Sequence, residues 1–132
     1  MRELTDHKVN PANDKLSVLA LDLPGSGGAC HSYQISGYDP SSNPSIGATP
    51  ATFPAPCIIL FQNGPIGEVG VNGVTHEALL AILIDRLESF QAGPFANSYN
   101  ENALGSLKAA QGWLFDRTRS RMERGVEGTH TV

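Results

Sequence analysis

This chain of 132 residues has few cysteines, few charges and no long hydrophobic run. Its two cysteines, Cys30 and Cys57, favour reduced, partly buried side chains over a disulfide framework. No segment approaches the ~20 apolar residues that a membrane-spanning helix needs, and the N-terminus lacks the apolar stretch of a signal peptide. Charged residues make up 17% of the chain and hydrophobic residues 40%, which is typical of a globular protein. We therefore expect one soluble domain that is not exported.

Several function classes are disfavoured by charge and spacing. The formal net charge of −4 repels long nucleic acids at a distance. The four histidines and two cysteines show neither His-x3-His nor Cys-x2-Cys spacing, so we expect no metal. The glycine-rich residues 24–29 lack the Gly-Lys-Ser/Thr of a nucleotide-hydrolysing loop and predict a turn. We expect no catalytic residue and no cofactor.

The first half of the chain favours strands. Apolar residues alternate in residues 16–23 and again in residues 31–38, which predicts two strands with His31, Tyr33 and Ile35 on a common face of the second. Residues 57–62 predict a third strand. Asn63-Gly64 then predicts a two-residue hairpin turn into an edge strand over residues 66–71, because Pro65 cannot donate to a ladder.

A proline-rich loop separates the second and third predicted strands. Residues 39–56 contain five prolines, which disfavours both helix and strand. We expect this loop to be dispensable for folding but to contribute to function, since long loops in small domains often cover a ligand or touch a neighbouring subunit.

The second half predicts two helices. Thr75 can cap a helix over residues 76–91, which Gly93-Pro94 ends. A second helix, over residues 98–124, starts with a capping box of Ser98 and Glu101. Its packed stripe comprises Leu104, Leu107, Gln111, Leu114 and Thr118.

These elements predict an α+β fold in which an N-terminal antiparallel β-sheet is followed by a C-terminal two-helix hairpin. We expect residues 1–132 to form a single domain. Its β-sheet part covers about residues 16–71, its helical hairpin about residues 75–124, and its tail residues 125–132.

Four arginines close the last predicted helix. Arg117, Arg121 and Arg124 are spaced four and three apart, so we expect them on one face, beyond the packed half of the helix, with Trp113 one turn earlier. Such a cluster can be a solvated helix end whose cations complement the helix dipole. It can also bind phosphate, because the planar guanidinium matches two oxygens.

Long ordered motifs resemble a known family. They are Phe61-Gln62-Asn63-Gly64-Pro65-Ile66, residues 68–75, 84–88 and 93–95, Asn102-Ala103-Leu104 and residues 124–130. Over residues 61–130 the chain resembles the phage-encoded Thoeris anti-defence family of the first type. Its predicted hairpin is also similar to that of phage anti-CBASS cyclic-nucleotide sponges.

The resemblance implies a non-catalytic sponge. Such a protein sequesters the cyclic ADP-ribose isomers of Thoeris immunity in the host bacterial cytoplasm, so that the immune effector is never activated. Family members bind this ligand between two protomers. Some assemble into homohexamers, rather than homodimers, with further pockets for the cyclic di- or trinucleotides of CBASS immunity.

The ligand-binding candidates combine aromatic rings, amides and arginines, which suits a nucleobase beside a pyrophosphate. Either Asn100 or Asn102 can contact a ribose or base edge, or simply cap the helix. The full set of candidates is Phe90, Phe95, Asn100, Asn102, Trp113, Arg117, Arg121, Arg124 and Thr129. Asp85, Arg86 and Glu88 are interpreted as surface charges.

Two rival functions stay open. A phosphodiesterase that degrades the same signals would need His31 or His76 to converge on the pocket. A small DNA-binding regulator would use residues 117–124 as its recognition face, which the acidic net charge disfavours.

Overall fold

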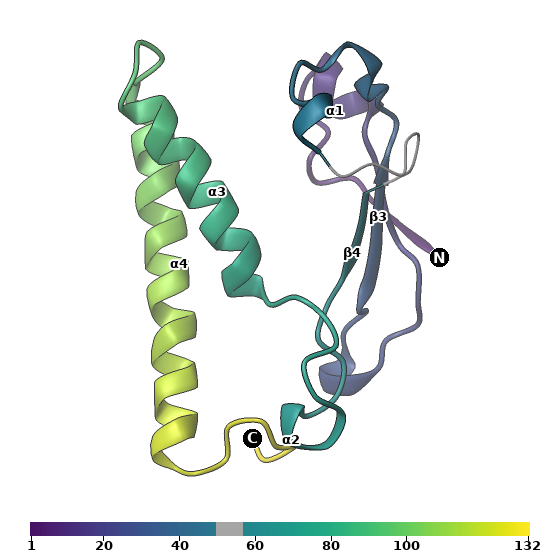
Figure 1. The fold of residues 1–132 in the computed structure, drawn as a ribbon, viewed down its shortest axis with the longest axis vertical. Helices are drawn as coiled ribbons and strands as arrows, with labels where there is room; N and C mark the ends of the chain where they lie inside the picture. Colours follow the sequence, from purple (N-terminus) through teal and green to yellow (C-terminus); the bar gives the residue numbers. More distant parts are fainter. Residues whose placement is uncertain (50–56) are drawn as a thin grey trace. The chain divides into compact units, whose positions relative to one another are not determined.

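The computed structural model describes residues 1–49 and 57–132, which form two compact units. The first unit covers residues 1–63 and the second residues 64–132, and each is described by itself (Figure 1). The predicted α+β class is confirmed, as is the order of an N-terminal sheet followed by helices. That residues 1–132 act as one domain stays a prediction. Residues 50–56 of the predicted loop lie outside the described residues.

The first unit is a four-stranded antiparallel sheet whose strands follow one another in chain order. Its strands are β1 (Arg2–Leu4), β2 (Ser17–Ala20), β3 (Ser32–Ser36) and β4 (Cys57–Leu60). The three predicted strands are confirmed within shorter bounds. Strand β1 was missed because three mostly polar residues are too short to show alternation.

One face of this sheet carries its apolar packing. Val18 lies opposite Ile35, and Ala20 lies opposite Tyr33, so the predicted common faces of β2 and β3 coincide. Ala20 is completely buried, and the Tyr33 ring meets Phe61 edge-on with ring centroids 5.7 Å apart. The register therefore follows the hydrophobic alternation.

Short helical turns lie outside the predicted strands and the two predicted helices. Helix α1 (Pro11–Lys15) starts at Asn10, whose side chain accepts a hydrogen bond from the Asn13 amide at 2.8 Å. The 3-10 helix η1 (Ser26–Gly28) forms the glycine-rich turn. Helices η2 (Pro40–Ser42) and η3 (Ile46–Ala48) lie in the proline-rich loop. The exclusion of helix there was too strict, because proline is well suited to a first helical turn.

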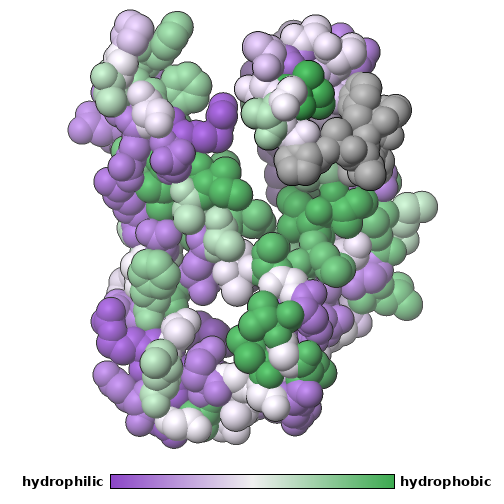
Figure 2. Space-filling model, in the orientation of Figure 1, coloured by the Kyte–Doolittle hydropathy of each residue, from purple (hydrophilic) through white to green (hydrophobic). Residues whose placement is uncertain are grey.

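The predicted edge strand over residues 66–71 is wrong. Residues Ile66–Val69 form helix α2, which starts after Pro65 and ends at Gly70 with a φ of 75°. The amides of Glu68 and Val69 both donate to the Pro65 carbonyl at 3.0 Å. Pro65 thus begins a helix rather than an edge strand, and residues 66–71 belong to the second unit. Figure 2 shows apolar surface over this segment, where Ile66 and Val69 are exposed.

Helix α3 covers His76–Gln91, as predicted. The Thr75 hydroxyl accepts a hydrogen bond from the Ala78 amide at 3.1 Å, which confirms Thr75 as its cap.

Helix α4 covers Ser98–Glu123, but its cap is Asn97. The Asn97 side chain accepts from the Asn100 amide at 2.8 Å, so the predicted capping box of Ser98 and Glu101 is wrong. The Gln91 side chain also forms two hydrogen bonds with the Asn97 backbone, each 3.1 Å long. Its Nε2 donates to the Asn97 carbonyl, and its Oε1 accepts from the Asn97 amide. This tertiary contact selects Asn97 over the serine that follows it.

Helices α3 and α4 pack side by side (Figure 1). Their less exposed positions recur alternately three and four residues apart, as in a coiled-coil seam. These positions are Glu77, Leu80, Ile84, Leu87 and Gln91 in α3, and Asn100, Leu104, Leu107, Gln111, Leu114, Thr118 and Arg121 in α4; Leu79 and Gly112, each next to one of them, are also partly buried. The predicted stripe of α4 is confirmed. Helix α4 is 26 residues long and α3 only 16, so about 15 Å of α4 has no α3 residues beside it.

The carboxylate of Asp22 fastens the end of β2 to the start of β3. It accepts hydrogen bonds from the His31 amide at 2.9 and 3.0 Å and from the Ser32 amide at 3.1 Å. These bonds, the one from His31 foremost, hold the pKa of Asp22 below its ordinary value of 3.8.

We expect Asp22→Asn to lower the melting temperature near neutral pH. A lowered folded-state pKa contributes stability that is present above pH 3.8 and lost as pH falls through the folded-state value. The difference in melting temperature between wild type and variant should therefore shrink below that pH. A pH series of thermal melts checks this, and a difference that does not change with pH would contradict it.

Candidate functional site

A pocket of about 370 Å³ lies at the C-terminal end of α3 and in the turn that follows it. All of its lining residues belong to the second unit. They are Asp85, Arg86, Ser89, Phe90, Gly93, Pro94 and Phe95. We call this the aromatic pocket. Two predicted ligand-binding residues, Phe90 and Phe95, are therefore brought together.

The two rings of the aromatic pocket meet edge to face. Their centroids are 6.4 Å apart and their planes differ by 82°. The Arg86 guanidinium carbon lies 5.6 Å from the centroid of the Phe90 ring, within cation–π range. Phe95 is 70% exposed, so its ring is available for stacking.

Arg86 was missed as a site residue by the sequence interpretation. Its spacing of four residues before Phe90 is the signal that could have revealed it, since such residues are neighbours on a helix. Its neighbour Glu88 has a different role, because its carboxylate pairs with Lys108 of α4 at 3.6 Å.

A second cluster of predicted site residues lies at the other end of α4. Trp113 is 75% exposed, and Arg117 follows one turn later and is also exposed. Among residues 1–49 and 57–132, no side chain or backbone group forms a hydrogen bond or ion pair with the Arg117 guanidinium. An open indole and an open guanidinium therefore share this surface.

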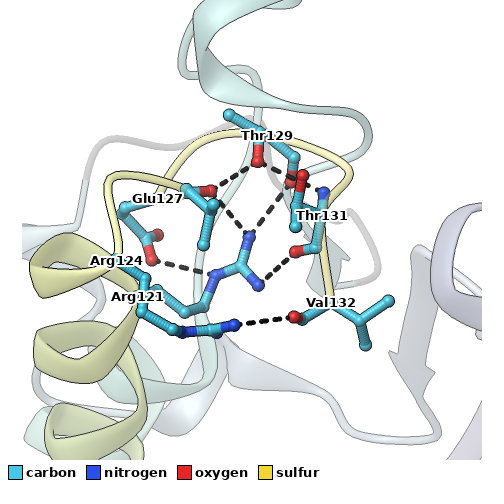
Figure 3. Close-up of polar contacts among 7 residues, drawn as sticks. Arg121, Arg124, Glu127, Thr129, Thr131 and Val132 are labelled. Carbon is cyan, nitrogen blue, oxygen red and sulfur yellow. Dashed lines mark hydrogen bonds and ion pairs between the residues drawn. The ribbon is translucent and has the colours of Figure 1, made fainter.

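Contrary to the prediction, Arg121 does not project into solvent. It is only 7% exposed, because the residues that follow α4 fold back around it. Its Nε donates to Glu127 at 3.2 Å (Figure 3). Its remaining nitrogens donate to the carbonyls of Val126, Thr129 and Thr131.

The other arginines also differ from one another. Arg124 is the C-cap of α4 and donates to the Val132 carbonyl at 3.0 Å. Arg119 pairs with Asp116 at 2.9 Å. The prediction that these arginines lie beyond the packed half of the helix is wrong for Arg121, which is buried. That Arg117, Arg121 and Arg124 bind a ligand stays a prediction.

The two candidate asparagines are separated by their environments. Asn100 is partly buried and lies on the seam, and its backbone amide donates to the Asn97 side chain. Asn102 is exposed. Thr129 uses its hydroxyl to donate to the Val126 carbonyl. Of these three residues, Asn102 has the side chain most accessible to a ligand.

The two clusters lie at opposite ends of α4. From Ser98 to Arg117 the helix rises by roughly 28 Å, at 1.5 Å per residue. The residues of the aromatic pocket precede Ser98 along the chain, whereas the arginines lie near the end of the helix. Figure 1 shows that the turn after α3 lies at the start of α4 and the C-terminal residues at its other end. One protomer by itself therefore does not bring its rings and its open arginine together.

Metal-binding clusters and membrane-spanning helices are both absent from the described residues. Residues 1–49 and 57–132 contain no group of three or more His, Cys, Asp or Glu side chains that could hold a metal ion. None of the helices in this part of the chain is long and apolar enough to cross a membrane.

Comparison with known proteins finds similarity over about half of the chain. Residues 54–117 match the family model of the Acb2/Tad1 hairpin domain. A protein named Thoeris anti-defense 1, from Bacillus phage SBSphiJ7, is 49% identical over 70 residues, which are 53% of this chain and 49% of that protein. The match thus spans about half the length of the relative. Residues 54–117 are therefore similar to the Acb2/Tad1 hairpin domain, and the resemblance of the chain to the Thoeris anti-defence family of the first type is confirmed.

Proposed function

We propose that this protein is a phage anti-defence sponge that binds cyclic ADP-ribose isomers in the infected cell's cytoplasm and withholds them from the Thoeris effector. The relative named Thoeris anti-defense 1 and the match to the Acb2/Tad1 hairpin domain support this function. Binding without turnover is sufficient for such a role, because the free signal concentration falls when the sponge is in excess.

The observation that carries the proposal is the pair of complementary clusters at the two ends of α4. The aromatic pocket offers an exposed ring for an adenine face, and each stacked base contributes about 1–3 kcal/mol. Arg117 offers an unengaged fork for a pyrophosphate. Asn102 lies between them along the helix and suits a ribose hydroxyl.

A complete site requires two copies of the chain. A cyclic ADP-ribose isomer is far shorter than the roughly 28 Å from Ser98 to Arg117. If two α4 helices lie antiparallel around a twofold axis, the aromatic pocket of one copy meets Arg117 of the other, and this occurs twice. We therefore propose a homodimer, or a homohexamer built from such dimers, with the ligand between protomers.

Exposed apolar side chains on α4 are consistent with this pairing. Tyr99, Trp113 and Phe115 are all exposed. In the described part of the second unit, Ile84 is the one hydrophobic residue classed as buried. A second copy would cover apolar surface that this unit leaves open to water.

Capture followed by heat release tests the function. The protein is incubated with a cyclic ADP-ribose isomer, separated from free ligand, heated, and the released material is assayed for effector activation. Intact ligand supports a sponge. Altered ligand would instead indicate a phosphodiesterase, although neither His31 nor His76, which such an enzyme would need, lines the aromatic pocket. Absence of capture would overturn the proposal and leave the DNA-binding regulator.

Competition extends the same test to the ligands of CBASS immunity. A cyclic di- or trinucleotide that binds in a separate pocket should be captured without displacing the cyclic ADP-ribose isomer. Displacement would show that both ligands use the arginines and rings of the proposed site.

A further inference from the structure

Strand β4 lies at one edge of the four-stranded sheet and pairs with β3 alone among the described strands (Figure 1). Proteins usually protect such edges with charged side chains or with proline, which prevent pairing with another chain. The opposite edge, β1, carries Arg2 and Glu3. Strand β4, Cys57–Leu60, contains neither a charged residue nor a proline. The two edges therefore differ, and β4 is the unprotected one.

The side chains of β4 are apolar on both faces of the sheet. Ile59 lies on the apolar packing face. On the other face, Ile58 lies opposite Gln34 and Leu60 lies opposite Ser32, and both apolar side chains are 52% exposed. An unbroken apolar run is typical of a strand that is covered on both faces and both sides. Ile58 and Leu60 thus expose apolar surface that the first unit does not cover.

The backbone groups on the open side of β4 belong to Ile58 and Leu60. The Phe61 amide donates to the carbonyl of His31, just before β3, at 2.8 Å, so the backbone of Phe61 faces β3. Successive residues of an antiparallel strand direct their backbone groups to opposite sides. Ile59 therefore also faces β3, whereas the amides and carbonyls of Ile58 and Leu60 point away from it.

We propose that this edge pairs with the same edge of a second copy of the chain, antiparallel, about a twofold axis at Ile59. In this register, Ile58 of each copy exchanges both of its backbone hydrogen bonds with Leu60 of the other copy. The exposed side chains of Ile58 and Leu60 then lie beside each other and cover apolar surface on both copies. The two Ile59 residues lie opposite each other at the axis.

The register follows from the symmetry. A twofold axis perpendicular to the sheet keeps every side chain on its own face, so odd-numbered residues must lie opposite odd-numbered ones and even opposite even. An axis at Ile58 or at Leu60 would pair only one of these two residues within β4. The axis at Ile59 pairs both.

A second copy suits this edge because a twofold contact is self-complementary. One uncharged strand supplies both halves of the pairing, and no like charges are brought together. The pairing goes beyond the proposed function, since it involves no ligand. Its consequence for assembly rests on that function: with the proposed α4 dimer, each copy has two different twofold interfaces. Alternating such interfaces builds closed assemblies of dihedral symmetry, of which a homohexamer is one.

Cysteine cross-linking tests the register. Ile59→Cys, combined with Cys57→Ser to remove the exposed native thiol, places two cysteines opposite each other at the axis. The Cα atoms of such a pair are about 4.5 Å apart, within the range of a disulfide. Ile58→Cys with the same Cys57→Ser change is the matched control. Its two cysteines would be diagonal neighbours about 7–8 Å apart, too far for a disulfide.

We expect mild oxidation of the ligand-free protein to give at least about tenfold more covalent dimer from Ile59→Cys than from Ile58→Cys, because only the first pair meets disulfide geometry. Denaturing gels without reductant measure the yield, and thermal melts of the reduced proteins verify that both variants fold. No dimer from Ile59→Cys, or equal yields from the two variants, would overturn the inference.

Charge pairing tests the same interface without a cross-link. Ile58→Lys with Leu60→Lys places like charges opposite each other, whereas Ile58→Lys with Leu60→Glu places opposite charges there. Both positions are half exposed in the single copy, so the fold should tolerate either pair.

Light scattering without ligand gives the number of copies in each assembly. We expect the double-lysine variant to contain at most half as many copies as wild type, and the lysine–glutamate variant to keep the wild-type number. A monomeric wild type, or an unchanged number in the double-lysine variant, would overturn the pairing. An equal loss in both variants would overturn its register. Neither measurement involves a cyclic ADP-ribose isomer, so failure of the pairing and failure of the proposed function are told apart.

Discussion

Replacing Arg117 by glutamine is expected to weaken capture of a cyclic ADP-ribose isomer at least about tenfold, with no change in melting temperature. A hydrogen bond to a charged group contributes about 1.5–3 kcal/mol, and about 1.4 kcal/mol corresponds to a factor of ten in Kd. The fold should be unaffected, because the exposed Arg117 side chain has no partner among the described residues.

Titration calorimetry and thermal melts measure the two effects. Arg119→Gln is the matched control, because it removes the same charge from the same exposed helix two residues away. Equal affinities for Arg117→Gln and wild type would remove Arg117 from the site. A loss of affinity in the control as large as in Arg117→Gln would show that affinity depends on the total positive charge of α4 and not on a contact made by Arg117.

Two variants that each bind weakly are expected to restore part of the tight binding when they are mixed. Phe95→Ala removes an exposed ring from the aromatic pocket, and Arg117→Gln removes the free arginine from the other end of α4. If each site combines the pocket of one copy with Arg117 of the other, a mixed dimer contains one intact site and one site with both defects. Random pairing makes half of the dimers mixed, so about a quarter of the sites should recover wild-type affinity.

Co-expression of the two variants, followed by titration, tests this complementation. Each variant alone should show no sites of wild-type affinity. Light scattering establishes whether the protein is a dimer or a larger assembly, and a mixture of wild type with wild type carrying a different tag verifies that subunits exchange. Exchange without recovered binding would show that each site lies within one protomer, and a monomer in the presence of ligand would rule out the shared site.

The elements predicted correctly from sequence are those whose signals are local and repeated. Helix α3 was predicted at its exact bounds, since Thr75 caps it and apolar residues recur through four turns. The seam of α4 was also predicted, because its spacing of three and four residues is sustained over most of the helix. Strands β2 and β3 followed from alternation.

The errors occurred where one short signal permits two structures. Asn-Gly followed by proline suits a hairpin turn, but the same proline suits the start of helix α2. Ser98 and Glu101 fit a capping box, yet Gln91 of the neighbouring helix binds the Asn97 backbone and shifts the cap by one residue. Only the folded contact decides between such alternatives.

The sequence by itself determined the α+β class, the two long helices and the residue types of the site, because these depend on periodicity and on side-chain chemistry. The tertiary structure alone decided which arginine is free. Arg117 and Arg121 are identical side chains one turn apart. Helix α4 extends beyond α3, and the residues after α4 fold back onto this end of the helix. Arg121 is therefore enclosed by carbonyls, while Arg117 stays in solvent. That difference arises from the packing of residues 126–131, which carry no periodic signal for a sequence to reveal.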